Sequence, residues 1–236
     1  MKYMWSKNRI AKEILPIILK DRKPNQWYVE PFVWGANIID KVDWNRIGGD
    51  SNLYLIQLLK KIQEWFDFRS LKIDKALYKQ MKSNPIQYIE SIVWFVGICC
   101  SYSWKWFWWY AWKTQTKEWI RDYQDEAIKN IEKQRPNLRD IIFKHNKYNE
   151  LRLPSNSIIY CDPPYEWTTW YKNNFNHSEF WDWCREKKEE WHIIFISEYN
   201  APEDFKEVWR KEVKSSLSAN WKSWWSKQSI EKLFTL

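Results

Sequence analysis

The chain has 236 residues, of which 44% are hydrophobic and 29% are charged, so it is globular rather than disordered. This length suits one domain, or a core domain that carries an insertion. The formal net charge of +8 points toward a polyanionic partner, although a soluble protein can be this basic without one.

Targeting and metal-binding patterns are missing from the sequence. The N-terminal residues lack the apolar core of a signal peptide, and no apolar run is long enough to cross a bilayer. The four cysteines show neither paired zinc spacing nor a disulfide framework. We therefore expect a cytoplasmic protein with no metal and no membrane contact.

The beginning of the chain alternates between helical and strand patterns. Residues 6–20 predict a helix after an N-cap serine, and residues 27–33 predict a strand. A small-residue loop over 34–37 then opens a second helix, and a short strand over 46–50 ends in an acid. Apolar residues at helical spacing predict a helix over 53–65. This β-α-β-α order predicts an α/β fold with a doubly wound, mainly parallel sheet.

In the middle of the chain this alternation stops. Residues 73–82, 86–100 and 121–134 have helical patterns, separated by polar turns and an aromatic-basic stretch. We therefore predict a mainly helical insertion over residues 66–150. The remainder, residues 1–65 and 151–236, would form the domain that contains the sheet.

The sheet pattern resumes at Ser157, where a β-branched apolar run predicts a buried strand. The strand stops at Asp162, and Pro163, Pro164 and Tyr165 follow at once. Each proline restricts the residue before it, so the loop is extended and stiff. Open α/β sheets place their chemistry at the carboxyl ends of strands. A helix over roughly 178–190 and a strand over 192–197 complete the pattern.

Two further acids lie at predicted strand ends. Glu30 ends the strand before the small-residue loop, and Asp50 follows 20 residues later. In dinucleotide-binding folds an acid at about this offset holds ribose hydroxyls. No phosphate-binding glycine loop with a following Lys-Ser/Thr is present, so a nucleoside cofactor without a polyphosphate fits better. A simple helix-capping role for Asp50 is an equally good reading of that residue alone.

In this order, these motifs resemble those of the Dam-type DNA adenine methylases, which belong to the α group of adenine-N6-specific DNA methyltransferases. The resemblance runs from residue 2 to the Glu231-Lys232-Leu233-Phe234 tail. The Asp-Pro-Pro-Tyr motif matches without departure. The motifs that carry the resemblance are residues 2–7, 30–36, 49–52, 103–111, 162–165 and 195–199.

The resemblance implies a Rossmann-like sheet that uses S-adenosylmethionine, with the insertion as the target-recognition domain. It implies methyl transfer to the N6 amine of an adenine flipped out of double-stranded DNA. The implied catalytic residues are Asp162, Pro163, Pro164 and Tyr165. The implied cofactor-binding residues are Tyr3, Lys7, Glu30, Phe32, Trp34, Gly35, Asp50 and Asp162. Candidate DNA contacts are Lys105, Lys113 and Arg121, although charged residues on such a block are usually its solvated face. We further expect a monomer whose protein partner is a cognate restriction endonuclease.

The tryptophan content is abnormal. The chain has 21 Trp and 4 Gly, whereas average usage of about 7% glycine would give roughly 16. The excess falls where the family or the turn requires Gly, at Trp5, Trp34, Trp104, Trp108, Trp109, Trp112, Trp167 and Trp170. Our hypothesis is that the source organism decodes UGA codons as glycine and that these codons were translated as tryptophan. The rival hypothesis is a genuinely Trp-rich or inactivated protein.

Other functions remain open at this point. A methyltransferase acting on cytosine N4, RNA or a protein glutamine would share the Pro-Pro-aromatic chemistry, but Asp before the prolines and the motif order disfavour it. A non-catalytic DNA-binding relic would keep the fold while tryptophan blocks the cofactor. A membrane-surface role for the aromatic stretch 104–112 is more distant.

Overall fold

The computed structural model describes residues 1, 6–111, 113–115, 119–165, 175–214 and 228–236. The chain divides into two compact units. Unit 1 comprises Met1–Lys12 and Pro31–Leu151, and unit 2 comprises Glu13–Glu30 and Arg152–Leu236. Within the described residues, no helix combines the length and the apolar character that a membrane span requires.

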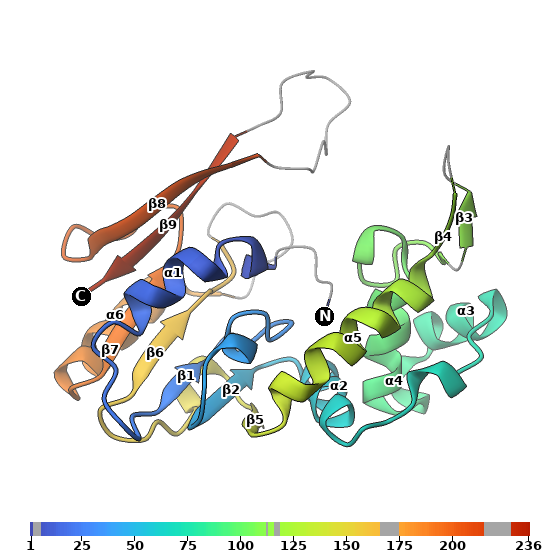
Figure 1. Ribbon diagram of the computed structural model, residues 1–236, viewed down its shortest axis with the longest axis horizontal. Helices are drawn as coiled ribbons and strands as arrows, with labels where there is room; N and C mark the ends of the chain where they lie inside the picture. Colours follow the sequence, from blue (N-terminus) through green and yellow to red (C-terminus); the bar gives the residue numbers. More distant parts are fainter. Residues whose placement is uncertain (2–5, 112, 116–118, 166–174, 215–227) are drawn as a thin grey trace. The chain divides into compact units, whose positions relative to one another are not determined.

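Unit 1 contains four α-helices among its described elements, together with short helical turns and four strands. Figure 1 shows α4 and α5 in this unit, with the β3–β4 hairpin leading directly into α5. Its elements are η1 (Lys7–Arg9), η2 (Ile39–Lys41), β2 (Arg46–Asp50), α2 (Leu53–Gln63), η3 (Phe68–Ser70), α3 (Lys75–Ser83), η4 (Pro85–Gln87), α4 (Glu90–Trp94), η5 (Phe95–Cys99), η6 (Tyr102–Trp104), β3 (Lys113–Gln115), β4 (Ile120–Asp122), α5 (Tyr123–Leu138), β5 (Ile141–His145) and η7 (Tyr148–Glu150).

Strands β2 and β5 form a parallel pair in unit 1, with Arg46 opposite Ile141 and Asp50 opposite His145. All five residues of β2 are buried. A Cβ atom at Gly48 would lie 2.7 Å from Val33 Cγ2, and β2 therefore packs closely enough here to require glycine. The carboxyl end of β2 is held in a tightly packed environment.

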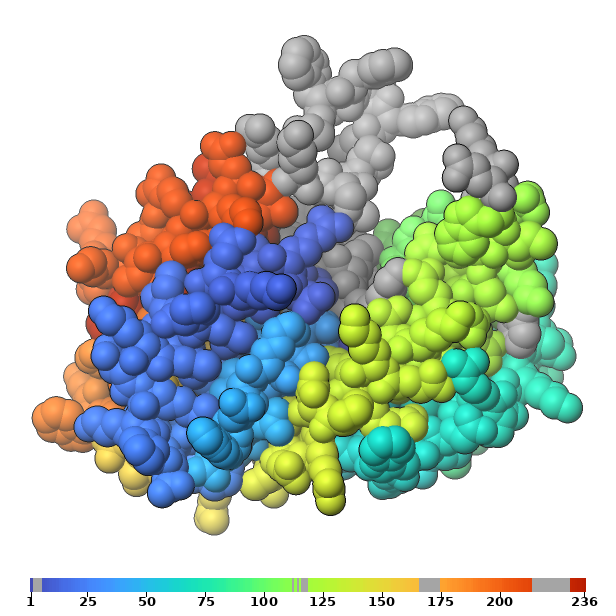
Figure 2. Space-filling view, viewed as in Figure 1, coloured from blue at the N-terminus to red at the C-terminus, as the bar shows by residue number. Residues whose placement is uncertain are grey.

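The helices of unit 1 are fixed to one another by apolar packing and by charged groups. Helix α2 buries Leu55, Leu58 and Leu59 on one face. Arg69 of η3 forms ion pairs with Asp125 (3.0 Å) and Glu132 (2.9 Å) of α5. In Figure 2 the yellow-green surface of α5 borders a teal surface.

Among its described residues, unit 2 has five strands, in the order β1-β6-β7-β9-β8. The pairs β1–β6 and β6–β7 are parallel, and β7–β9 and β8–β9 are antiparallel. Helix α1 (Ala11–Ile18) leads into this unit. The other elements are β1 (Tyr28–Glu30), β6 (Ile158–Cys161), α6 (His177–Glu189), β7 (Ile193–Ser197), β8 (Lys206–Lys214) and β9 (Gln228–Thr235). Strand β6 is paired on both sides and all four of its residues are buried.

The predicted α/β class with mainly parallel strands is confirmed, while several elements differ from the prediction. The strand predicted over 27–33 covers only Tyr28–Glu30, because Pro31 has no N–H to continue a ladder. The helix expected after the loop over 34–37 is a single turn, Ile39–Lys41. The predicted helix over 86–100 is divided into a 3-10 turn, α4 and the π-helix η5.

Among the described elements, five strands (β3, β4, β5, β8 and β9) were not predicted from the sequence. Strand β5 pairs with β2, and β8 and β9 form the C-terminal hairpin of unit 2. The predicted insertion contains β5 and the β3–β4 hairpin besides its helices. The proposed boundaries of the insertion and of the sheet-containing domain remain predictions.

Candidate active site

Asp162 lies directly after β6, an interior strand of unit 2. Strand β6 is hydrogen-bonded to β1 on one side and to β7 on the other, so its carboxyl end has a fixed position. The Asp162 side chain is half-buried, Pro163 is buried and Pro164 is half-buried. A carboxylate on a proline-stiffened loop is thus held at the end of a rigid strand.

Tyr165 is held by groups from two other elements of unit 2. Its hydroxyl donates a hydrogen bond to Glu231 Oε2 of β9 at 3.0 Å. Its ring packs edge-on against Tyr199, which follows β7, with ring centroids 4.6 Å apart and an interplanar angle of 73°. These contacts orient the ring independently of the loop that carries it.

The surroundings of Tyr165 are strongly negative. Burial raises the pKa of the Tyr165 phenol well above its ordinary value, and the charges of Asp162, Glu231 and Glu198 raise it further. Burial and the charge of Asp162 also raise the pKa of Tyr160. Several carboxylates therefore act on the same small region, and such a region stabilises a positive charge and repels an anion.

Glu30 ends strand β1 and is buried, with 2% of its surface exposed. The hydroxyl of Tyr28 donates to Glu30 Oε1 at 2.8 Å. On β6 and β7, Tyr160 and Ser197 share a hydroxyl–hydroxyl hydrogen bond of 2.8 Å. The Tyr160–Ser197 bond thus ties β6 to β7, whereas the Tyr28–Glu30 bond lies within β1.

In unit 1, Asp50 ends strand β2 and is buried. Its Oδ1 accepts the Asn52 N–H at 2.9 Å, and its Oδ2 accepts the Trp34 N–H at 3.3 Å. Burial raises the pKa of the Asp50 carboxyl from 3.8 to about 6, against the opposing effect of these two N–H donors and of His145. The Asp50 carboxyl is therefore mainly ionised at neutral pH, and its titration lies just below neutral pH.

The loop before β2 surrounds Asp50 with further predicted residues. Val33 N–H donates to Gly49 O at 2.8 Å, which fixes the loop against β2. The Phe32 ring stacks on Tyr148 with centroids 5.4 Å apart. The side-chain amide of Gln134, on α5, donates to Gly35 O at 3.0 Å. Within unit 1, Trp34 therefore contacts Asp50 directly, while Phe32 and Gly35 of the same loop are held by Tyr148 and Gln134.

Trp34 and Lys7 are predicted site residues of unit 1. Trp34 has φ = +43°, a left-handed conformation that a bulky residue rarely adopts. Lys7 begins η1, where Ser6 accepts the Asn8 N–H at 3.3 Å. Tyr3 lies outside the described residues, as do Trp5, Trp112, Trp167 and Trp170.

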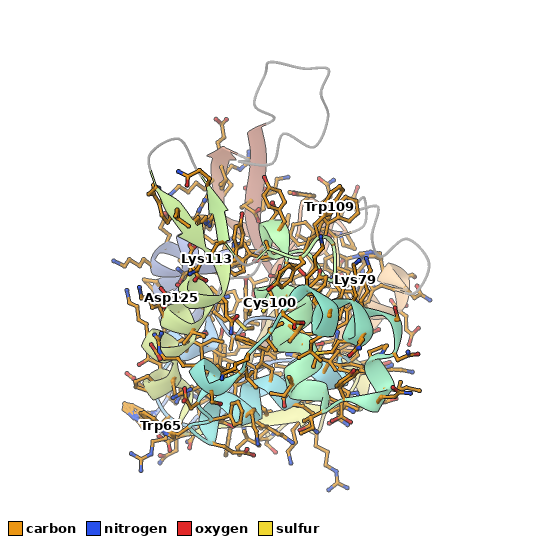
Figure 3. The ribbon with its side chains drawn as sticks, turned by 90° about the vertical axis from the view of Figure 1, so that its right-hand side faces the viewer. Trp65, Lys79, Cys100, Trp109, Lys113 and Asp125 are labelled. Atoms are coloured by element: carbon orange, nitrogen blue, oxygen red, sulfur yellow. The ribbon has the colours of Figure 1, made fainter. Side chains whose placement is uncertain are left out.

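The three candidate DNA-contacting residues all belong to unit 1. Lys113 on β3 is exposed and is labelled in Figure 3 on the hairpin strand. Arg121 on β4 forms an ion pair with Glu126 at 2.8 Å. The Lys105 ammonium lies 4.3 Å from the centroid of the Trp108 ring. Arg121 is therefore engaged within the protein, whereas Lys113 is on a projecting strand.

Sequence reasoning missed Gln134, Tyr148 and Glu231 as site residues. Gln134 is a buried polar residue on α5, and no local pattern marks its contact with a loop 99 positions earlier. Tyr148 and Glu231 also act through contacts between distant segments. Glu231 lies in the tail that carries part of the resemblance, which was the one available signal.

Among the residues that the structure describes, no group of three or more His, Cys, Asp or Glu side chains is arranged to hold a metal ion.

Comparisons with known proteins give a structural likeness. No protein-family model matches the chain, and no curated protein sequence matches it. Solved structures do match, among them that of SMU.472, a protein provisionally assigned as a methyltransferase and crystallised with SAH. The identity is 10% and the TM-score is 0.41; the match covers 100% of this chain and 53% of the other. This chain thus spans about half the length of SMU.472.

Proposed function

We propose that the protein is a DNA methyltransferase that transfers a methyl group from S-adenosylmethionine to the N6 amine of a flipped adenine. The observation that carries this proposal is the Asp162-Pro163-Pro164-Tyr165 segment, held at the end of the buried strand β6 among several carboxylates. The acid can accept hydrogen bonds, the prolines fix its position, and the tyrosine offers a ring face.

The carboxylate of Asp162 addresses the central difficulty of the reaction. An adenine amine is a poor nucleophile because its lone pair is delocalised into the ring. Asp162 accepts one hydrogen bond from the amine and the Pro163 carbonyl accepts a second, which favours a pyramidal nitrogen with a localised lone pair. Preorganised hydrogen-bond donors in oxyanion holes lower the barrier by about 3 kcal/mol each in other enzymes, and fixed acceptors act here by the same principle.

Tyr165 is proposed to stack on the target base. An adenine amine in a duplex is base-paired, so the base must leave the stack before it can react. Stacking on an aromatic ring contributes about 1–3 kcal/mol per base. The hydrogen bond to Glu231 and the packing against Tyr199 keep the ring in place before the base arrives.

Residues in unit 1 suit the nucleoside part of the cofactor. Asp50 is a buried carboxylate whose remaining acceptor capacity suits ribose hydroxyls, and Phe32 offers an apolar ring. Lys7 suits the cofactor carboxylate, and Tyr3 and Gly35 belong to the same proposed set. Glu30, which belongs to unit 2, is a further proposed cofactor residue. When bound, S-adenosylmethionine supplies an activated methyl group on a positively charged sulfur.

The proposed nucleic-acid partner is double-stranded DNA. Lys105, Lys113 and Arg121 are the proposed phosphate contacts, and the net charge of +8 is consistent with a polyanion. We propose a monomer that works in the cytoplasm without a metal ion. A cognate restriction endonuclease is the protein partner that such an activity suggests.

One observation favours a second candidate, the non-catalytic relic. An indole at Trp34, in a left-handed conformation beside Asp50, does not fit a loop that lies under a nucleoside. If the residue is tryptophan in the living cell, we expect no cofactor binding. Methyl transfer to cytosine N4, RNA or a protein glutamine is the less favoured enzymatic alternative, because Asp rather than Ser or Asn precedes the prolines.

The test is methylation of a plasmid in a methylase-deficient host, read by single-molecule sequencing. We expect N6-methyladenine at a defined site with the glycine-restored chain, in which glycine replaces Trp5, Trp34, Trp104, Trp108, Trp109, Trp112, Trp167 and Trp170, and none when Asp162→Ala is added. Absence of modified adenine from the glycine-restored chain would contradict the proposal. Binding of S-adenosylmethionine, measured on the same purified chains, distinguishes the relic, which would not bind it, from a methyltransferase with another substrate.

A further inference from the structure

Tryptophan occupies backbone conformations that belong to glycine. Eleven described residues other than glycine have a positive φ, and five of them are tryptophan. Only a few per cent of non-glycine residues adopt such a φ, and for bulky side chains it is a genuine outlier. None of the four glycines in the chain has a positive φ. The five tryptophans are Trp34, Trp44, Trp65, Trp104 and Trp191.

Two of these residues end α-helices in the same way. After α2, Trp65 has φ = +59°; its N–H donates to Ile62 O at 3.2 Å, and the Phe66 N–H donates to Lys61 O at 3.4 Å. This pair of bonds defines the Schellman motif, whose left-handed position is usually glycine.

Helix α6 ends with the same pair of bonds. Trp191 has φ = +68°; its N–H donates to Lys188 O at 3.0 Å, and the His192 N–H donates to Lys187 O at 3.0 Å. The two motifs lie in different units of the chain. Tryptophan therefore occupies the usual glycine position of a Schellman motif once in each unit.

The indole rings at these helix ends gain little from packing. Trp65 is 64% exposed and Trp191 is 81% exposed. The guanidinium of Arg135 lies 5.2 Å from the Trp65 ring centroid, a weak cation–π contact at an exposed site. Figure 3 labels Trp65 at the edge of the molecule in that view. Packing therefore does not account for a bulky residue in either position.

The other three residues occupy tight turns. Trp44 and Asn45 are consecutive left-handed residues, with φ = +37° and +36°, and Ser103 and Trp104 form a second such pair. Turns that need positive φ at two consecutive positions are dominated by Gly, Asn and Asp. Trp34 has φ = +43°, and its backbone N–H donates to Asp50 Oδ2. Each of these three positions requires a positive φ, which glycine adopts without a steric cost.

A second class of tryptophan in the chain behaves as the residue normally does. Trp94 has φ = −65° in α4 and is 6% exposed. Trp183 lies inside α6 and is 5% exposed, with its ring stacked on Phe180 at 6.2 Å between centroids. Their large side chains fill the core, as tryptophan side chains do.

We infer that positions 34, 44, 65, 104 and 191 are glycine in the protein as its native cell makes it, while Trp94 and Trp183 are tryptophan. This division between positions arises if the cell reads UGA codons as glycine and the printed sequence was translated with UGA as tryptophan. Codons that encode tryptophan in the cell then give tryptophan in both. The inference adds Trp44, Trp65 and Trp191 to the positions that the motifs alone had suggested. It rests on backbone conformation and is independent of the proposed function.

The direct test is peptide mass spectrometry of the protein isolated from its native cells, with sequencing of its gene. We expect glycine at the five positions and tryptophan at 94 and 183. In the gene we expect UGA at the five positions and the ordinary tryptophan codon UGG at the other two. Tryptophan at the five positions, or UGG codons there, would overturn the inference.

A second test uses the tryptophan-containing chain itself, in equilibrium unfolding by urea. A left-handed conformation costs a non-glycine residue roughly 1–2 kcal/mol, so we expect Trp191→Gly to raise the folding equilibrium constant by about tenfold. Trp191→Ala is the matched control, because it removes the indole and keeps the Cβ; it should show much less gain. Trp183→Gly, in the same helix, should destabilise strongly. Equal stabilisation by Ala and Gly at position 191, or none by Gly, would contradict the inference.

Discussion

Two strand ends of this molecule place an acid at the start of a loop, and they differ in how well the surrounding residues suit the backbone. At the end of β6, Asp162 is followed by two prolines whose restrictions match an extended loop. At the end of β2, Asp50 accepts an N–H from Trp34, whose φ of +43° suits glycine. The proposed amine-binding part is therefore consistent with its sequence, while the proposed cofactor-binding part conflicts with it.

This difference separates two kinds of failure. A defect at the end of β6 would remove chemistry and leave cofactor binding largely intact. A defect at the Trp34 loop would remove cofactor binding and leave the chemical groups in place. Variants at the end of β6 should therefore reduce the rate of methyl transfer, whereas variants at the Trp34 loop should change cofactor affinity.

The largest effect is expected for Asp162→Ala, made in the Trp34→Gly chain. Removing one preorganised hydrogen-bonding group that acts in a transition state lowers kcat by about 10²–10³ in other enzymes. We expect a loss of at least that size in single-turnover methyl transfer, with a smaller change in cofactor affinity. Asp182→Ala, which removes an exposed carboxylate from α6, is the control and should be as active as its parent. A comparable loss in both variants would argue against a catalytic role for Asp162.

The next largest effect is a gain in cofactor affinity at the end of β2. Trp34→Gly removes the indole and the left-handed strain, so we expect the affinity for S-adenosylmethionine to rise by tenfold or more in a calorimetric titration. Trp44→Gly relieves a similar strain at a residue that is 66% exposed, and should change stability without changing affinity. If both variants gain affinity equally, the gain reflects general stability and not the cofactor loop.

How far the sequence predicted these two ends depends on the range of the interactions involved. The strand before Asp162 and the helix after Asp50 follow from local patterns, and both are present. Strand β5 was not predicted, because its burial pattern depends on pairing with β2, about 95 positions away in the chain. The contact of Gln134 with the loop at Gly35 has the same origin.

The sequence alone identified some, but not all, of the tryptophans that occupy glycine conformations. Trp34 and Trp104 were identified because they replace glycine in motifs. Trp65 and Trp191 belong to no motif, and only the bonds that close their helices show what those positions require. Sequence patterns identify residues that chemistry needs, whereas the φ that a position must adopt depends on how its helix is terminated.

A pH dependence should mark the β2 end alone. Burial raises the pKa of Asp50 to about 6, so its carboxylate takes up a proton as the pH falls through this value. Ribose hydroxyls need the ionised acceptor, so affinity for S-adenosylmethionine in the Trp34→Gly chain should be constant above pH 7 and fall by up to about tenfold per pH unit below 6. Asp50→Asn should bind weakly with a flat profile between pH 5 and 8. An unchanged pH profile in Asp50→Asn would assign the titration to another group.

A smaller effect is expected at the β6 end from Glu231→Gln. The substitution keeps a hydrogen-bond acceptor for the Tyr165 hydroxyl and removes one of the charges that raise the pKa of that phenol. Hydrogen bonds to charged groups contribute about 1.5–3 kcal/mol and neutral ones about 1 kcal/mol, so we expect a several-fold loss in kcat/KM for DNA. Glu212→Gln on the adjacent strand β8 is the control. An equal loss in that variant would point to a general charge effect rather than to positioning of Tyr165.

The smallest effect concerns the DNA contacts, which lie apart in sequence from both acids. Each phosphate contact contributes about 0.9 to the slope of log affinity against log salt concentration. Lys113 is exposed on β3, whereas the Arg121 guanidinium is engaged by Glu126 at 2.8 Å and lies 4.5 Å from the Tyr123 ring centroid. Lys113→Ala should therefore reduce the slope by about one, and Arg121→Ala by less, in fluorescence-anisotropy titrations at several salt concentrations. A larger reduction for Arg121→Ala would mean that DNA displaces Glu126 from the ion pair, and Arg121 would then be the principal contact of the hairpin.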